Sequence, residues 1–195
     1  STYPRDLGRD RAFAAARGVG CLFMPTDGAM YPAPPRVRVS PGPLAGHLCA
    51  PWRPGHFEGV LTVVAKLCHI VEPDIAIFGR KDIQQARMIQ RMVRDLDFPV
   101  SVTVAPTTRE ADGLALSSRN AYLGPAERRV AVQISRAVDA GHELYRSGNR
   151  AAPEIVAAVR GVLAREASIA VQYVEVVDPE DLAPVIQAAD NTVLA

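Results

Sequence analysis

The feature that most constrains the fold is an alternation of helical and strand-like segments in the middle of the chain. Over residues 55–71 apolar side chains recur at three- and four-residue steps, which predicts an amphipathic helix. A short apolar strand is predicted over 74–78, a second helix over 83–96 and a second strand over 100–104. This order is typical of βαβ units with a parallel sheet. Such sheets bind ligands at the carboxyl ends of their strands, so functional residues are expected there.

The flanking segments complete the predicted order of elements. Helices are expected over 6–17, 126–145 and 152–167, and strands over 19–24, 37–39 and 171–177, with a strand-like segment closing the chain at 191–195. We place a domain boundary near Thr108. It separates a parallel α/β part, residues 1–107, from a smaller α+β part, residues 108–195.

The charge balance excludes several classes of partner. In 195 residues, 22 Lys and Arg oppose 21 Asp and Glu, which leaves a net charge of +1. We therefore expect no general attraction to nucleic acid or to a membrane surface, and no apolar run reaches membrane-spanning length. Any anion must be bound by a local arrangement of groups.

The three cysteines, Cys21, Cys49 and Cys68, are odd in number and widely spaced. They suggest neither a disulfide framework nor a zinc motif, and no metal-ligating residues are assigned. We expect buried or half-buried free thiols in a reducing cytoplasm.

The first candidate site lies over residues 78–85, where the predicted strand passes into a helix. Free backbone N–H groups at a helix start favour an anion, and Gly79 allows close backbone approach. Lys81 can place an ammonium on a phosphate. Asp82 could cap the helix, hold Lys81 or help to position a metal, and the Gln85 amide suits a hydroxy acid. The alternative is a plain capped helix with a surface lysine.

The second candidate site is the segment 113–120, which follows the strand over 100–104. Two adjacent hydroxyls, Ser117 and Ser118, are followed by Arg119, whose guanidinium can bind phosphate in bidentate fashion. Alone, the segment would be interpreted as a solvated turn. Both candidate sites, however, follow strands of one predicted sheet and could face the same phosphate chain.

A third candidate is the segment 53–60. Arg53 could lie near a carboxylate or phosphate, whereas His56 is interpreted as a cap or packing residue; the alternative is a simple helix start with Pro and Gly. The sequence contains no Walker A run, no G-x-G-x-x-G and no recognisable Ser-His-Asp order.

Three segments of the chain resemble motifs of the pantothenate synthetase family. They are Arg53-Pro54-Gly55-His56-Phe57, the run from Phe78 to Gln85 and the run from Arg109 to Asn120, with shorter matches at Tyr3-Pro4-Arg5, Met30-Tyr31-Pro32 and Pro41-Gly42-Pro43-Leu44. The resemblance implies a ligase in which the pantoate carboxylate attacks the α-phosphate of ATP. Pantoyl adenylate forms with release of pyrophosphate, and the amine of β-alanine then displaces AMP. It also implies Mg²⁺ as a cofactor, a homodimer and a cytoplasmic location.

The resemblance also implies roles for individual residues. ATP would be bound by Gly79, Arg80, Lys81, Asp82, Thr108, Leu116, Ser117, Ser118 and Arg119, and pantoate by Gln85 and Arg53. The catalytic residues would be Lys81, Ser117, Ser118 and Arg119, with the last three in a mobile phosphate-binding loop. Thr108 would offer backbone contacts to the adenine.

The chain departs from the family pattern in several places. Arg80 stands where a Glu is usual, and Leu48-Cys49-Ala50 where Leu-Glu-Gly is usual. The H-x-G-H motif is absent, and there is neither an initiator Met nor a signal pattern. The resemblance therefore implies an incomplete Rossmann-like nucleotidyl transferase domain, lacking its first βα units, followed by a smaller α+β lid domain.

Three functional hypotheses follow. In the first, the full-length protein makes pantothenate and releases AMP, while the chain as written has weak or no activity. The second is a related nucleotidyl transferase for another small acid. The third is a non-catalytic remnant that binds nucleotide or forms a dimer.

Overall fold

A computed structural model describes residues 6–195, so the short match at Tyr3-Pro4-Arg5 lies outside the described part. The α-helices and strands, in chain order, are α1 (Leu7–Ala15), α2 (Asp27–Met30), α3 (His56–Val71), β1 (Ile75–Gly79), α4 (Ile83–Asp95), β2 (Ser101–Ala105), α5 (Pro125–Arg146), α6 (Ala152–Leu163), β3 (Val176–Val177) and β4 (Val193–Leu194). Short 3₁₀ turns are η1 (Gly42–Gly46), η2 (Ala50–Trp52), η3 (Arg80–Asp82) and η4 (Ser118–Tyr122).

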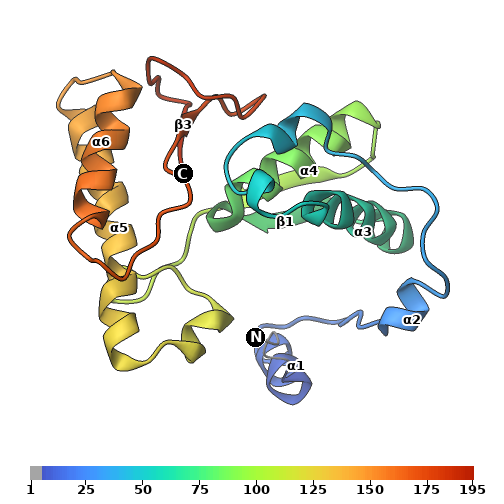
Figure 1. Cartoon of the computed structure of the whole chain (residues 1–195). Helices are drawn as coiled ribbons and strands as arrows, with labels where there is room; N and C mark the ends of the chain where they lie inside the picture. Colours follow the sequence, from blue (N-terminus) through green and yellow to red (C-terminus); the bar gives the residue numbers. More distant parts are fainter. Residues whose placement is uncertain (1–5) are drawn as a thin grey trace.

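The predicted parallel arrangement is confirmed. Strands β1 and β2 pair in parallel, from Ile75 with Ser101 through Gly79 with Ala105, and α4 forms the connection between them. Figure 1 shows α3 and α4 beside this sheet. Because Gly79 and Ala105 are register partners, the segments that follow both strands leave the sheet at the same edge.

The first hydrophobic core is built from the apolar stripes of α3 and α4. It contains Leu61, Met88 and Ile89, each at most 2% exposed. Val177 and Leu182 from the C-terminal segment are fully buried in the same core. The last part of the chain therefore stabilises the parallel α/β part as well as its own surroundings.

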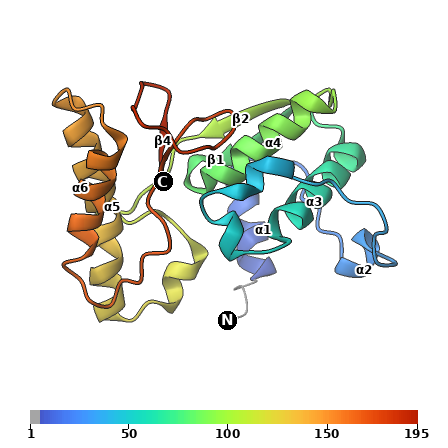
Figure 2. The same ribbon diagram turned by 45° about the horizontal axis from the view of Figure 1, so that its top comes forward.

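The C-terminal half is centred on the pair α5 and α6, which stand side by side away from the sheet in both ribbon views (Figures 1 and 2). Ala137, Val159, Leu163 and Val174 form a second core between them. The strands β3 and β4 pair antiparallel. The segment after α6 thus contributes to both halves, and the division at Thr108 stays a prediction.

Two predicted strands are absent from the described structure. Over 19–24 no strand forms, and Val19, Leu22, Phe23 and Met24 are 42–48% exposed. A strand needs a hydrogen-bonded neighbour, and within residues 6–195 the sheet of β1 and β2 has no third member. The segment 37–39 is also not a strand, because the Val39 N–H donates to the Thr62 hydroxyl at 3.0 Å instead of to a neighbouring strand.

Other predictions, on the length of two strands, the burial of the thiols and the cap of α4, are only partly met. Of the strand predicted over 171–177, only Val176–Val177 is regular, and of 191–195 only Val193–Leu194. All three thiols are free, but the expectation of burial is wrong for Cys21, which is exposed in the segment that forms no strand. Asp82 makes no capping hydrogen bond to α4.

Candidate functional site

A cleft of about 680 Å³ lies at the carboxyl ends of β1 and β2. Its lining comes from three separate parts of the chain: Arg53, His56, Gly79, Lys81, Asp82, Gln85, Ala105, Pro106, Thr107, Thr108, Leu116, Ser117, Ser118 and Arg119. The volume falls in the range of ordinary small-molecule sites. Its position is the one that parallel sheets provide for ligands.

The cleft gathers every residue predicted as functional from the sequence except Arg80. Arg80 is exposed and does not contribute to the lining, although it lies beside Lys81. The geometry brings the other residues together, while their individual roles stay predictions.

One wall of the cleft, which we call the lysine wall, follows β1 and is formed by Lys81, Asp82 and Gln85. The strand ends at Gly79, η3 follows directly, and α4 begins at Ile83, so Lys81 and Asp82 lie in the tight turn between strand and helix. No described residue forms an ion pair with either side chain. Gln85, one turn further on, is half-buried. The wall therefore presents an ammonium, a carboxylate and an amide to the same space.

The serine wall is the segment 116–119. The Ser117 hydroxyl accepts from the Arg119 N–H at 3.3 Å, which shapes the start of η4. The Leu116 N–H donates to the Thr108 carbonyl at 2.9 Å, so the end of this wall is tied to the segment that leaves β2.

A polar cluster, which we call the loop anchor, connects the residues on either side of the serine wall; it is formed by Glu110, Asp112, Asn120 and Arg128. Arg128 contacts Glu110 at 2.8 Å and Asp112 at 2.7 Å, and the Asn120 amide donates to Glu110 at 2.9 Å. The hydrogen bond from the Leu114 N–H, together with Arg128, holds the pKa of Asp112 below its usual value. The loop anchor thus fixes both ends of the segment that carries Ser117 and Arg119.

The third wall begins at the end of η2. Arg53 follows this turn, and Gly55, at φ +74°, allows the left-handed step into α3. His56 is the first residue of α3 and packs edge-on against Phe57, with ring centroids 5.0 Å apart. The sequence interpretation of His56 as a cap or packing residue was incomplete, because His56 also lines the cleft.

Ala105, Pro106 and Thr107 were also missed as lining residues. The signal was available, because they follow directly on a predicted strand at the edge where ligands bind.

The charges of the cleft suit a polyphosphate. Arg53, Lys81 and Arg119 supply three cationic groups and Asp82 one carboxylate, so these four carry a net charge of +2. Among residues 6–195 no group of three or more His, Cys, Asp or Glu side chains could hold a metal ion. Over the same residues no helix is both long and apolar enough to cross a bilayer.

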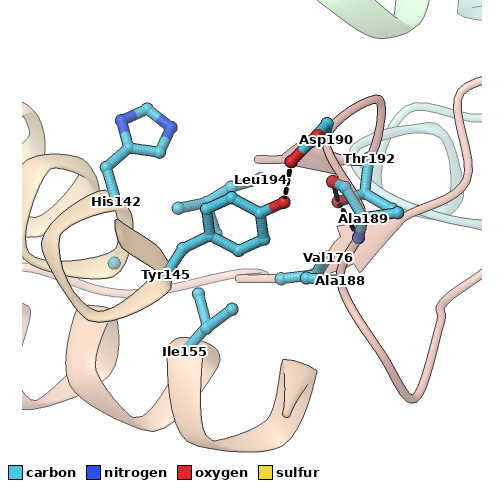
Figure 3. Close-up of a pocket in the computed structure, with 10 residues that line it drawn as sticks. His142, Tyr145, Ile155, Val176, Ala188, Ala189, Asp190, Thr192 and Leu194 are labelled. Carbon is cyan, nitrogen blue, oxygen red and sulfur yellow. Dashed lines mark hydrogen bonds between the residues drawn. The ribbon is translucent and has the colours of Figure 1, made fainter. Parts of the chain in front are cut away.

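A second cavity, of about 110 Å³, lies between α5, α6 and the C-terminal segment (Figure 3). Its polar lining includes His142, Thr192 and Tyr145. The Tyr145 hydroxyl donates to Asp190, and this hydrogen bond raises the pKa of Tyr145. Ile155, Val176 and Leu194 supply apolar walls. The cavity is too small for a nucleotide, whereas the cleft of about 680 Å³ has room for one and is the candidate active site.

Comparison with known proteins shows which family the chain resembles. The model of the pantoate-beta-alanine ligase family matches residues 1–195. The pantothenate synthetase of Moorella thermoacetica is 47% identical over 193 residues, covering 99% of this chain and 68% of that protein. A bifunctional pantoate ligase/cytidylate kinase of Synechococcus elongatus is 44% identical over 198 residues, covering 38% of its own length.

Two solved structures show the same fold. The pantothenate synthetase of Thermus thermophilus superimposes with a TM-score of 0.93 at 44% identity, over 97% of this chain and 69% of that one. The Francisella tularensis pantoate-beta-alanine ligase, complexed with beta-gamma ATP and beta-alanine, gives a TM-score of 0.71 at 32% identity, over 89% and 62%. The chain belongs to the pantoate-β-alanine ligase family.

Proposed function

We propose that this protein joins pantoate to β-alanine at the expense of ATP, with the cleft between β1, α4 and the serine wall as its active site. Membership of the family supports the reaction. The observation that carries the assignment to this cleft is the convergence of three distant segments, around Arg53, Lys81 and Arg119, on one space. The Francisella tularensis ligase, complexed with beta-gamma ATP and beta-alanine, has the same fold.

The chemistry proceeds in two steps. A carboxylate oxygen of pantoate attacks the α-phosphorus, the bond to the β-phosphate oxygen breaks, and pyrophosphate leaves from pantoyl adenylate. The amine of β-alanine then attacks the acyl carbon, loses a proton and expels AMP. Negative charge increases on the α-phosphate during the first step, so fixed cations nearby lower its barrier.

The cleft residues have complementary roles in this reaction. Lys81 and Arg119 stabilise the phosphate charge, while the Ser117 and Ser118 hydroxyls donate to phosphate oxygens. Gln85 and Arg53 bind pantoate, through an amide and a guanidinium respectively. These assignments rest on the shared cleft and on the family motifs.

Backbone groups and a single carboxylate complete the nucleotide site. Gly79 adds open space beside the phosphates, since a Cβ built there would meet no atom within 4 Å. The Thr108 carbonyl accepts from the Leu116 N–H and keeps a second lone pair, so both this carbonyl and the Thr108 N–H can contact adenine. Leu116 provides an apolar surface and is 53% exposed.

Mg²⁺ fits this site as a companion of the nucleotide. It is usually held by one or two carboxylates together with substrate phosphates. Among the residues that line the cleft, Asp82 supplies a carboxylate. When bound, the ion would neutralise charge on the phosphates, with Asp82 as its protein contact.

The remaining parts of the proposal concern assembly and location. The proposal of a homodimer rests on the family resemblance, and the exposed apolar side chains of the segment 19–24 are available to a partner surface. A cytoplasmic location is supported by the three free thiols.

The reaction is tested with protein expressed from the complete gene and supplied with ATP, Mg²⁺, pantoate and β-alanine. We expect AMP and pantothenate in equal amounts, and pyrophosphate without pantothenate when β-alanine is left out of a single-turnover experiment. Formation of neither product would overturn the proposal. Pyrophosphate release with a different small acid, and not with pantoate, would favour another nucleotidyl transfer reaction.

A further inference from the structure

Gln84 is a buried polar residue next to the active-site cleft that the proposed chemistry does not use. It is 5% exposed and lies in the first turn of α4, between Asp82 and Gln85 of the lysine wall. A buried amide is costly unless its donors and acceptors are satisfied. The location of its partners therefore indicates what the residue holds together.

All four hydrogen bonds of the Gln84 side chain go to one segment, residues 44–49. Its Oε1 accepts from the backbone N–H of Cys49 at 3.1 Å and from the Cys49 thiol at 3.2 Å. Its Nε2 donates to the carbonyls of His47 at 2.9 Å and Leu44 at 3.4 Å. Two donors and two acceptor positions are the full capacity of the amide, so the side chain is committed to this segment.

The segment 44–49 leads directly into the wall that carries Arg53. Backbone hydrogen bonds continue the connection, from Trp52 N–H to the Cys49 carbonyl at 3.1 Å and from Arg53 N–H to the Ala50 carbonyl at 3.0 Å. Leu48, which is 2% exposed and has φ +57°, fixes the direction of the turn from inside the core. A short hydrogen-bonded path therefore runs from Gln84 to Arg53.

We propose that Gln84 is a positioning residue for Arg53: it ties the segment 44–53 to the start of α4 and so fixes Arg53 relative to Lys81 and Gln85 across the cleft. This inference rests on the proposed function, in which Arg53 binds pantoate. Cys49, where the chain departs from the family pattern, contributes a second donor to the same amide oxygen.

Gln84→Met tests the inference, because methionine has a similar length and removes all four hydrogen bonds. We expect the KM for pantoate to rise about tenfold, with the KM for ATP changing less than about threefold. Gln84→Glu should act in the same direction, because an ionised carboxylate cannot donate to the His47 and Leu44 carbonyls. Thr62→Val is the matched control: it removes the partly buried hydrogen bond that the Val39 N–H donates to the Thr62 hydroxyl, outside the cleft, and should leave both KM values unchanged.

A double-mutant cycle distinguishes positioning from a general structural effect. If Gln84 acts through Arg53, Gln84→Met combined with Arg53→Ala should raise the KM for pantoate no further than Arg53→Ala alone. Multiplication of the two effects would overturn the inference and leave the proposed function intact. An Arg53→Ala variant with an unaltered KM would overturn both the inference and the pantoate role of Arg53.

Hydrogen exchange supplies a readout that needs no turnover. Backbone amides of residues 44–53 should exchange faster in Gln84→Met than in the unaltered protein, and should be unchanged in Thr62→Val. Unchanged exchange over 44–53 in Gln84→Met would overturn the inference even if the enzyme proved to use another acid.

Discussion

Gly141 in α5 packs closely against α6 and the C-terminal segment, and Gly141→Ala tests this packing. A Cβ added there would lie 2.7 Å from Leu194 Cδ2, 2.9 Å from Val159 Cγ2 and 3.4 Å from Ile155 Cγ2. The first two distances are shorter than normal carbon contacts. At least one neighbour must therefore move.

The cost differs between the two neighbours. Leu194 borders the small cavity of about 110 Å³ shown in Figure 3, so its terminal methyl can rotate into free space. Val159 is 3% exposed, and a β-branched side chain in a helix has one strongly preferred rotamer, so it resists displacement. Overpacking costs about 1–3 kcal/mol, whereas Ala in place of Gly inside a helix gains about 1 kcal/mol. We expect Gly141→Ala to lower the free energy of unfolding by about 1 kcal/mol.

Gly161→Ala is the matched control in the partner helix α6. A Cβ at Gly161 would meet no atom within 4 Å, so this change should raise the free energy of unfolding by about 0.5–1 kcal/mol. Urea denaturation of both variants at fixed protein concentration measures the difference. Equal stabilisation by the two substitutions would refute the packing argument.

Three further predictions concern the loop anchor and the thiols. Arg128→Met, which removes the contacts to Glu110 and Asp112, should weaken binding of a non-hydrolysable ATP analogue about tenfold, as measured by calorimetry. Arg91→Met, which breaks an exposed ion pair with Asp95, should leave this binding unchanged, and equal losses of affinity would contradict the positioning role of the loop anchor. The pKa of Asp112 in the folded protein lies below its usual value of 3.8. The ionised Asp112 carboxylate therefore stabilises the folded protein above pH 3.8, and this stabilisation is lost as the pH falls through the lowered pKa. Acid unfolding curves should therefore converge for Asp112→Asn and the unaltered protein at the lowest pH, and curves that diverge there would contradict this sign. Burial raises the pKa of Cys49 and Cys68, so iodoacetamide should label Cys21 first, while in urea all three should react alike; mass spectrometry that finds Cys49 labelled first would contradict the burial seen here.

The sequence predicted the parallel unit well because its signals are local. The stripes of α3 and α4 and the apolar runs of β1 and β2 each fit one period, and their order requires both strands to leave the sheet at one edge. That edge, together with the polar residues that follow each strand, is enough to place Lys81 and Ser117 near each other from the sequence alone.

What the sequence could not predict depends on partners far away in the chain. The apolar run 19–24 has the composition of a buried strand, yet no described strand pairs with it and its side chains are exposed. Arg80 and Lys81 are adjacent cations, and only the geometry of the turn decides that Lys81 lines the cleft. The sequence places Gln84 within a family motif, whereas its hydrogen-bond partners include the carbonyls of His47 and Leu44, which lie 37 and 40 residues earlier in the chain.

The central claim is that the cleft lined by Lys81 is the site of ATP-dependent ligation, and the pair Lys81→Met and Arg80→Met tests it most directly. The two cations are neighbours, but Lys81 lines the cleft and Arg80 does not. Losing a hydrogen bond to a charged group costs about 1.5–3 kcal/mol, so kcat/KM for ATP should fall about 10- to 100-fold in Lys81→Met and less than about threefold in Arg80→Met. Equal effects of the two substitutions, or no effect of either, would contradict the claim.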